Sequence, residues 1–229
     1  MGKLLQLAIC VKELLEDYHG IEARFELEKD CSWIPNFPDA KALGNYWDIV
    51  RRVYSALVDE KWELGSVLAG RTISFQPVGY ARADIWFKEP YSFIVEFDEK
   101  QHFNQFRLRT LEHGYKLIKT GFDVTRYTEL CKQNVIRPGK SGFTKLKSPD
   151  PLFPEMLEGY AQDNRTRQRA FRDYLKDVVP FALGMNPTIR IDYKITNGKI
   201  KDFQKEDIEA ARNYFRMTRL LQQIELKEV

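Results

Sequence analysis

The chain has 229 residues, of which 43% are hydrophobic and 30% are charged, and its formal net charge is +3. The length suits one medium domain with an elaboration, or one and a half domains, and the composition excludes a disordered or collagen-like chain. The small net charge neither requires nor excludes a nucleic-acid partner. Three cysteines without CxxC spacing give no disulfide framework and no thiolate zinc site. With no segment apolar enough to span a bilayer, we expect a reduced cytoplasmic protein with no membrane partner.

The first segment with a regular pattern is residues 4–18, whose apolar side chains recur at helical spacing. A loop rich in proline follows at residues 34–40. Asn45 is a candidate N-cap for a second amphipathic helix, which we expect to end near Leu64.

Alternating apolar and polar residues, with Glu89-Pro90 as a tight turn, predict strands in the middle of the chain. A helical stripe and a further run rich in β-branched and aromatic residues follow them. The elements expected here are three strands, a helix and a fourth strand, at residues 72–75, 83–87, 93–98, 104–119 and 122–127.

Acidic side chains gather on one face of the two middle strands. Because side chains alternate along a strand, Asp84, Glu96 and Asp98 fall together, with Lys100 and His102 at the rim. Such residues usually mark a solvated strand face, but Asp84 and Asp98 stand in apolar runs, and aspartate is a poor strand former. Crowded carboxylates repel one another, and a divalent cation would neutralise them. We therefore expect a metal site, and removal of Asp98 should leave the fold nearly intact.

This pattern resembles one branch of the PD-(D/E)XK nuclease superfamily, the branch that includes very-short-patch mismatch repair endonucleases. The shared features are an Asp in one strand, Glu-x-Asp in the next, and a His four residues after that Asp. Residues 121–127 are similar to the Gly-aromatic-x-Val-x-Arg-aromatic strand that closes this domain. The resemblance covers roughly residues 45–127. Glu99 stands where a glycine is common, and Asp98-x-Lys100 also matches the superfamily's usual Asp-x-Lys, so both registers stay open.

The resemblance implies a mixed α/β (α+β) fold with an αβββαβ restriction-endonuclease-like core in residues 45–130. Residues 1–44 would pack on this core as an N-terminal helix and loop. Residues 131–229 would form a basic loop and a C-terminal α/β extension, suited to DNA recognition or to a homodimer contact.

The implied activity is that of a metal-dependent DNA endonuclease. Mg²⁺, which Mn²⁺ could replace, would be held by Asp84, Glu96 and Asp98, and either Lys100 or His102 would transfer a proton. We expect a sequence-specific restriction-type enzyme first. The alternatives are a strand-nicking repair endonuclease of the very-short-patch type and a catalytically silent nuclease-fold module that binds nucleic acid or protein.

Basic side chains after residue 127 are the expected contacts to double-stranded DNA. Residues 132–147 form a basic loop that could cross a DNA backbone or simply solubilise the surface. A helix over residues 164–179 crowds four arginines into its first half, where cations oppose the helix dipole. A hairpin with strands at residues 188–193 and 199–203, turning at Asn197-Gly198, and a helix over residues 204–222 complete the chain. The residues expected to contact DNA in this part of the chain are Lys140, Lys145, Arg165, Arg167, Arg169 and Arg172. Gln101, Gln105 and Arg107, which follow the acidic strand, are expected to contact DNA as well.

Overall fold

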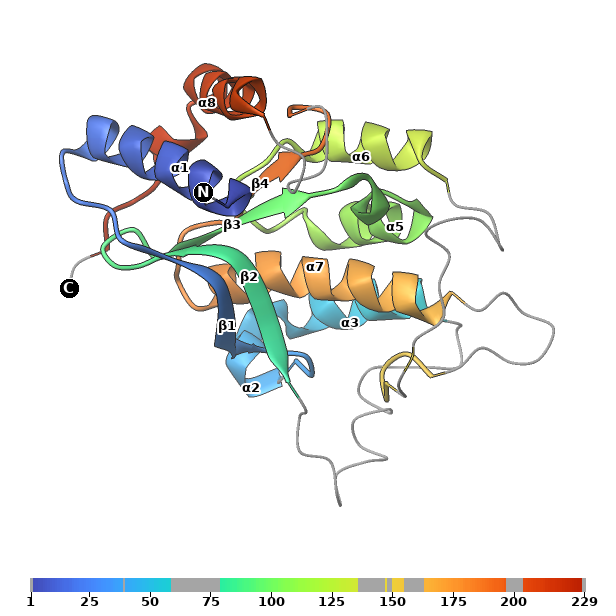
Figure 1. The fold of residues 1–229 in the computed structure, drawn as a ribbon. Helices are drawn as coiled ribbons and strands as arrows, with labels where there is room; N and C mark the ends of the chain where they lie inside the picture. Colours follow the sequence, from blue (N-terminus) through green and yellow to red (C-terminus); the bar gives the residue numbers. More distant parts are fainter. Residues whose placement is uncertain are drawn as a thin grey trace.

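A four-stranded sheet of order β1-β2-β3-β4 organises the chain (Figure 1). The computed structural model describes residues 2–38, 40–58, 79–135, 147, 150–154, 163–196 and 204–227. Strands β1 and β3 each pair antiparallel with β2, and β4 runs parallel to β3. The strands are β1 (Phe25–Pro35), β2 (Tyr80–Phe87), β3 (Phe93–Asp98) and β4 (Ile189–Asp192). The expectation of a mixed α/β fold is therefore confirmed at this level.

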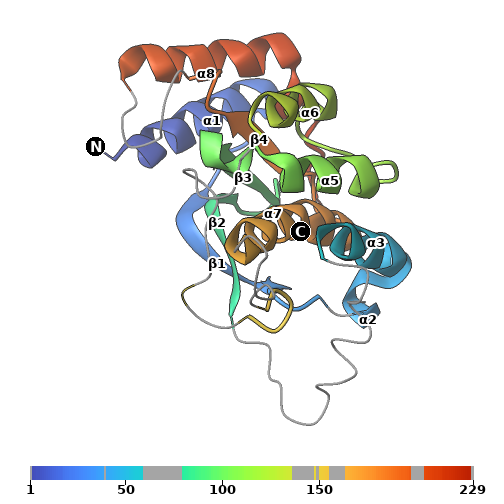
Figure 2. The same ribbon diagram turned by 90° about the vertical axis from the view of Figure 1, so that its right-hand side faces the viewer.

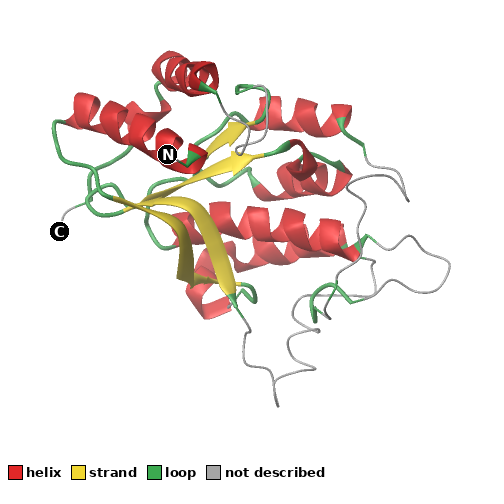
Figure 3. Cartoon of the chain, viewed as in Figure 1, coloured by secondary structure: helices red, strands yellow, loops and turns green. Residues whose placement is uncertain are grey.

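Helices cover both faces of the sheet, as Figures 2 and 3 show. On one face lie α1 (Lys3–His19) and α8 (Lys205–Thr218), whose apolar side chains join those of β3 in one core. On the other face lie α3 (Trp47–Leu57) and α7 (Asn164–Ala182), which share a second core with Ile94 of β3. The remaining helices are α2 (Ala40–Leu43), α5 (Gln105–Gly114) and α6 (Val124–Gln133), with short 3₁₀ turns η1 (Gly44–Tyr46), η2 (Lys100–His102) and η4 (Leu220–Gln223).

Burial on both faces explains the composition of the central strands. All six residues of β3 and all four of β4 are buried, so their charged side chains are enclosed rather than solvated. No helix of the described residues is long and apolar enough to cross a membrane.

Several predicted elements are confirmed. Helices α1, α7 and α8 and strands β2 and β3 lie where the sequence indicated, and β3 has the predicted bounds. Helix α5 also begins as predicted, because the side chain of Asn104 accepts hydrogen bonds from the N–H groups of Phe106 and Arg107. It ends at Gly114 instead of residue 119.

The strand predicted at residues 122–127 is wrong, because a helix, α6, begins there. The Asp123 side chain accepts hydrogen bonds from the backbone N–H groups of Thr125 and Arg126, at 2.8 and 3.1 Å. This cap outweighs the weak strand preference of the β-branched residues that follow. The strand that pairs with β3 on its far side is β4.

Two other differences concern the strands. The sheet begins with β1, which the sequence did not indicate, and β1 has an irregular burial pattern and a register shift between Cys31 and Pro35. The strand predicted at residues 72–75 and the hairpin turn at Asn197-Gly198 lie outside the described residues.

Candidate functional site

The site forms where β2 and β3 stop pairing. Their ladder has Ile85 opposite Val95 as its last pair on this side. Figure 1 shows β2 bending away from β3. At the next position, side chains take over the backbone hydrogen bonds. The Asp84 N–H donates to Glu96 Oε1 at 3.2 Å, and the Phe97 N–H donates to Asp84 Oδ2 at 2.8 Å. The two carboxylates therefore lie side by side in the gap between the strands.

Helix α7 contributes three more charged side chains to the site, and one of them, Lys176, contacts Glu96 in this gap. Asp173, Lys176 and Asp177 are spaced at i, i+3 and i+4, so they share one side of the helix. The Lys176 Nζ lies 2.6 Å from Glu96 Oε2. The remaining buried positions of α7 are mostly apolar, including Phe171, Tyr174 and Val178, and they fix the helix against the second core.

The Asp84, Glu96 and Lys176 cluster is short of positive charge. Burial raises the pKa of Glu96 to about 7, and the charge of Lys176 offsets this only in part. Burial also raises the pKa of Asp84, against the charge of Lys176 and the hydrogen bond from Phe97. Burial lowers the pKa of Lys176. The nearby acidic groups, Glu96 above all, raise this pKa by more, so it ends above its ordinary value. An added cation would favour both ionised carboxylates.

Asp98, by contrast, is already neutralised from within the protein. Both its carboxylate oxygens lie 3.0 Å from Nη1 of Arg190, and the Tyr127 hydroxyl donates to Oδ2 at 3.0 Å. Arg190 is fully buried and also contacts Asp177, at 2.7 Å. Arg107 pairs with the other oxygen of Asp177 at 3.1 Å. These charges are paired in one buried network, and pairing is the condition under which charged groups persist in a core.

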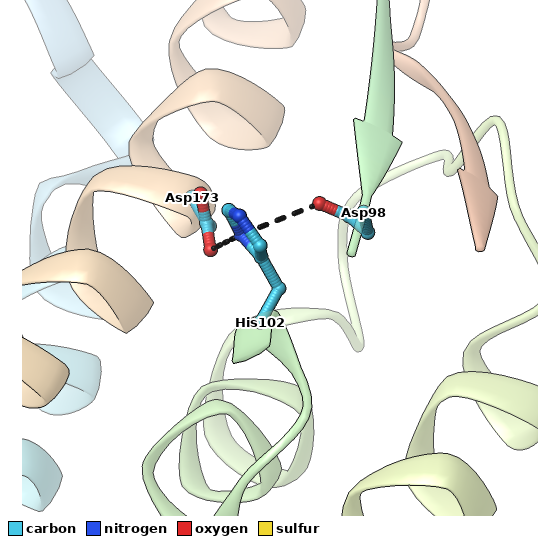
Figure 4. A group of neighbouring side chains, drawn as sticks. All are labelled: Asp98, His102 and Asp173. Atoms are coloured by element: carbon cyan, nitrogen blue, oxygen red, sulfur yellow. Dashed lines mark hydrogen bonds and ion pairs between the residues drawn. The ribbon is translucent and has the colours of Figure 1, made fainter. Parts of the chain in front are cut away.

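His102 lies between the Asp98 and Asp173 carboxylates (Figure 4). Its Nδ1 lies 2.9 Å from Asp173 Oδ2 and 3.5 Å from Asp98 Oδ1. Burial lowers the pKa of His102, but the charge and hydrogen bond of Asp173, helped by Asp98, raise it more, so it ends above its ordinary value. Potential ligand atoms of these three residues lie within 4.8 Å of one another, close enough for one metal ion. A cation there would face Arg190, so Asp98 is the poorer ligand.

The other residues predicted near the strands divide by exposure. Lys100 is exposed in η2, and the lysine that contacts a site carboxylate is instead Lys176. Gln101 is exposed and donates to Glu99 at 3.2 Å, while Gln105 is half-buried. Arg107 was expected at a DNA surface, but it is buried against Asp177, where no phosphate can reach it.

The four arginines of α7 also divide. Arg167 pairs with Asp163 at 2.6 Å and lies over the Phe106 ring at 4.6 Å, so it is part of the packing. Arg165, Arg169 and Arg172 are half-buried and spaced at i, i+4 and i+7, which puts them on one side of the helix. Lys140 and Lys145 lie outside the described residues.

Sequence reasoning missed Asp173, Lys176, Asp177 and Arg190. On α7 the charged residues alternate with apolar ones as they do on any amphipathic helix, so they read as a solvated face. In β4 the alternation Ile-Arg-Ile-Asp likewise reads as a half-exposed strand. The sequence does contain one indication of these residues. The crowded carboxylates on β2 and β3 require basic side chains from other elements of the fold.

No curated protein and no solved structure matches this chain. One family model does match, over residues 63–206, and its description is "Family of unknown function (DUF7255)". This span runs from residue 63 to residue 206, which is 144 residues of the 229. It includes every site residue from Asp84 to Arg190. The chain therefore belongs to this family of unknown function.

Proposed function

We propose that the protein is a metal-dependent nuclease that hydrolyses phosphodiester bonds in double-stranded DNA. The observation that carries this proposal is the contact of Lys176 with Glu96 beside Asp84, at the point where β2 and β3 part. Phosphodiester hydrolysis needs hard oxygen ligands for a divalent cation and positive charge near the phosphate. The cluster contains these residue types and little else.

The order of the elements around this cluster supports the same proposal. Helix α1, strands β1 to β3, helix α7 and strand β4 follow one another as αβββαβ, with insertions, and β4 runs parallel to β3. Carboxylates on the second and third strands of such a core resemble the PD-(D/E)XK arrangement. The core proposed here draws on residues outside 45–130, because β1, α7 and β4 lie beyond those bounds.

Asp84 and Glu96 are the residues that would hold the metal. They offer carboxylate oxygens, which suit Mg²⁺ and Mn²⁺. A bound ion would lower their raised pKa values and so favour the ionised carboxylates. Asp98, although expected as a third ligand, already has Arg190 and Tyr127 on its oxygens. When bound, the ion would polarise the scissile phosphate and acidify a water.

Lys176 and His102 would act beside the ligands. Lys176 donates to Glu96 and favours its ionised form, and its ammonium can also orient a water or balance charge on the phosphate. His102 lies close enough to Asp84 for its charge to lower the pKa of that carboxyl. It is the group for proton transfer near neutral pH. Lys176 takes the place that the sequence assigned to Lys100.

The test is incubation of the purified protein with supercoiled plasmid in Mg²⁺ and in Mn²⁺. Wild type should cut, and Asp84→Asn, Glu96→Gln and Lys176→Met should each lose on the order of 10²-fold or more in rate. Glu89→Gln, an exposed change in the turn between the same strands, is the matched control and should cut normally. Linear product indicates a restriction-type enzyme, and nicked circles indicate a repair-type enzyme. Intact plasmid in both metals would contradict the proposal.

A second candidate is a catalytically silent module that binds nucleic acid through the same fold. It is favoured by the internal neutralisation of Asp98 by Arg190, which removes one expected ligand. Its signature is duplex binding in Ca²⁺ with no cleavage in Mg²⁺ or Mn²⁺.

A further inference from the structure

His102 is held from one side only. Its Nδ1 faces Asp173 Oδ2 at 2.9 Å, with Asp98 Oδ1 at 3.5 Å. Among the described residues, the Asp173 carboxylate has no other hydrogen-bond partner, because the bond from Arg190 goes to the backbone oxygen of Asp173. Within the described residues, the Asp173 side chain therefore makes one hydrogen bond, and its partner is His102.

The charges around the imidazole decide where its proton sits. Asp173 on α7 and Asp98 on β3 are the acidic neighbours, and Arg190 on β4 holds Asp98. Arg169 on α7 opposes protonation of the ring. An ionised carboxylate only accepts hydrogen bonds, so the nitrogen that faces it must carry the hydrogen. In the neutral ring, Nε2 is then the nitrogen with the free lone pair.

The exposure of the three side chains agrees with this assignment. The Asp173 side chain is 5% exposed and that of Asp98 is 2% exposed, whereas that of His102 is 21% exposed. Nε2 has no hydrogen-bond partner within the part of the chain that the structure describes. The ring thus has a buried, anchored nitrogen and a second nitrogen left free for an outside group.

We propose that Asp173 is a positioning residue that fixes His102 as the Nδ1–H tautomer and so presents Nε2 as the proton acceptor of the site. Its part in catalysis rests on the proposed function. In that reaction, Nε2 takes one proton from the attacking water as the water oxygen bonds to phosphorus. The bond from phosphorus to the leaving oxygen breaks, and that oxygen receives a proton from the imidazolium or from solvent. Such an orienting carboxylate behind a histidine recurs in hydrolytic sites.

Nitrogen NMR tests the tautomer without any need for activity. The chain has three histidines, His19, His102 and His113, so His19→Gln and His113→Gln suffice to assign the signals. Above about pH 9 the His102 imidazole should be neutral. Long-range ¹H–¹⁵N correlation then distinguishes the protonated from the unprotonated nitrogen of the ring. In wild type, His102 should show a protonated Nδ1 and an unprotonated Nε2. A protonated Nε2 in wild type would overturn the proposal, and this result requires no variant.

The variants separate positioning from packing. Asp173→Ala should shift His102 toward the Nε2–H form that free histidine prefers. Asp163→Asn is the matched control, since Asp163 is an equally buried acid that pairs with Arg167 and does not contact His102. An unchanged His102 tautomer in folded Asp173→Ala would also overturn the proposal.

A kinetic measurement completes the test. In Mg²⁺, Asp173→Ala should lower kcat on the order of 10²-fold with little change in KM, and Asp163→Asn should lower neither. If the tautomer is as expected but wild type cuts no DNA, the positioning geometry stands and the proposed function fails. If wild type cuts DNA and His102 is the Nε2–H tautomer, the proposed function stands and the positioning role of Asp173 fails.

Discussion

Lys176 and Glu96 form an ion pair between helix α7 and strand β3, with Nζ and Oε2 2.6 Å apart and both side chains largely buried. Neither residue is isolated. Asp84 adds a second carboxylate on one side, and the Asp173 charge acts on Lys176 from its own helix. The pair therefore links the two elements that build the site, and its energetics can be measured separately from any reaction.

Breaking this pair should cost more than removing it. Lys176→Met leaves Glu96 buried without its cation, and Glu96→Gln leaves Lys176 without its anion, so each single change should destabilise the fold by several kcal/mol, about 3 to 5. The double variant should cost less than the sum, with a coupling of about 1 to 3 kcal/mol. Urea unfolding of the four proteins measures this. Strict additivity would mean that the contact contributes no coupling.

Glu96 should also make stability fall as pH rises through neutrality. Its folded-state pKa, about 7, lies above its ordinary value of 4.5, so the folded protein binds more protons than the unfolded chain between these values. The associated stability is fully present below pH 4.5 and is lost as pH rises through 7, to a total of about 3 kcal/mol. Thermal unfolding across this range should show the loss in wild type, and Glu96→Gln should show a flatter profile. Equal slopes in the two proteins would assign the effect to other groups.

Asp98→Ala should unfold or strongly destabilise the protein. The crowding of acidic residues suggested that removing Asp98 would relieve repulsion, but Asp98 is the counter-ion of the fully buried Arg190. Its loss leaves a buried guanidinium partly uncompensated, which costs about 3 to 5 kcal/mol. Asp30→Ala, a change in β1 of an acid with no ion pair among the described residues, is the control and should be nearly neutral. A fully stable Asp98→Ala would contradict the buried network.

The arginines of α7 should differ in their effect on DNA binding. Arg165 and Arg169 share one side of the helix, and converting both to Gln should reduce the salt dependence of affinity by up to about two units of slope. Arg167→Gln is the control, because this guanidinium already pairs with Asp163 and lies over Phe106. Binding should be measured in Ca²⁺ to prevent cleavage. A slope equal to wild type in the double variant would mean that this side of α7 does not contact the duplex.

The sequence predicted the acidic half of the site better than the basic half. Asp84 and Asp98 stand out because aspartate in apolar strand segments conflicts with local preference, and such conflicts mark sites. Glu96 stands out because it lies on the same strand face as Asp98. Lys176 and Asp173 carry no such mark, since charged residues are ordinary on an amphipathic helix. Only the parallel placement of β4 beside β3, with α7 packed on one face of this sheet, makes their side of the helix internal.

The fold was predicted in its parts more than in its assembly. Segment 122–127 reads as a strand by composition, yet the Asp123 cap makes it the start of α6. With that strand misplaced, the sequence assigns the segment of β4 to a C-terminal extension, whereas the structure pairs Arg190 of β4 with Asp98. Local patterns specify such elements, whereas the choice of the neighbouring strand depends on packing that a single sequence does not display.

The location of a bound metal tests the account most directly. Crystals grown in Mn²⁺ and measured for anomalous scattering would reveal the ion without reliance on activity. We predict one peak, within ligand distance of carboxylate oxygens of Asp84 and Glu96, which disappears in Glu96→Gln. A peak among Asp98, His102 and Asp173 instead, or no peak at either place at millimolar Mn²⁺, would contradict the proposed metal site and the nuclease mechanism built on it.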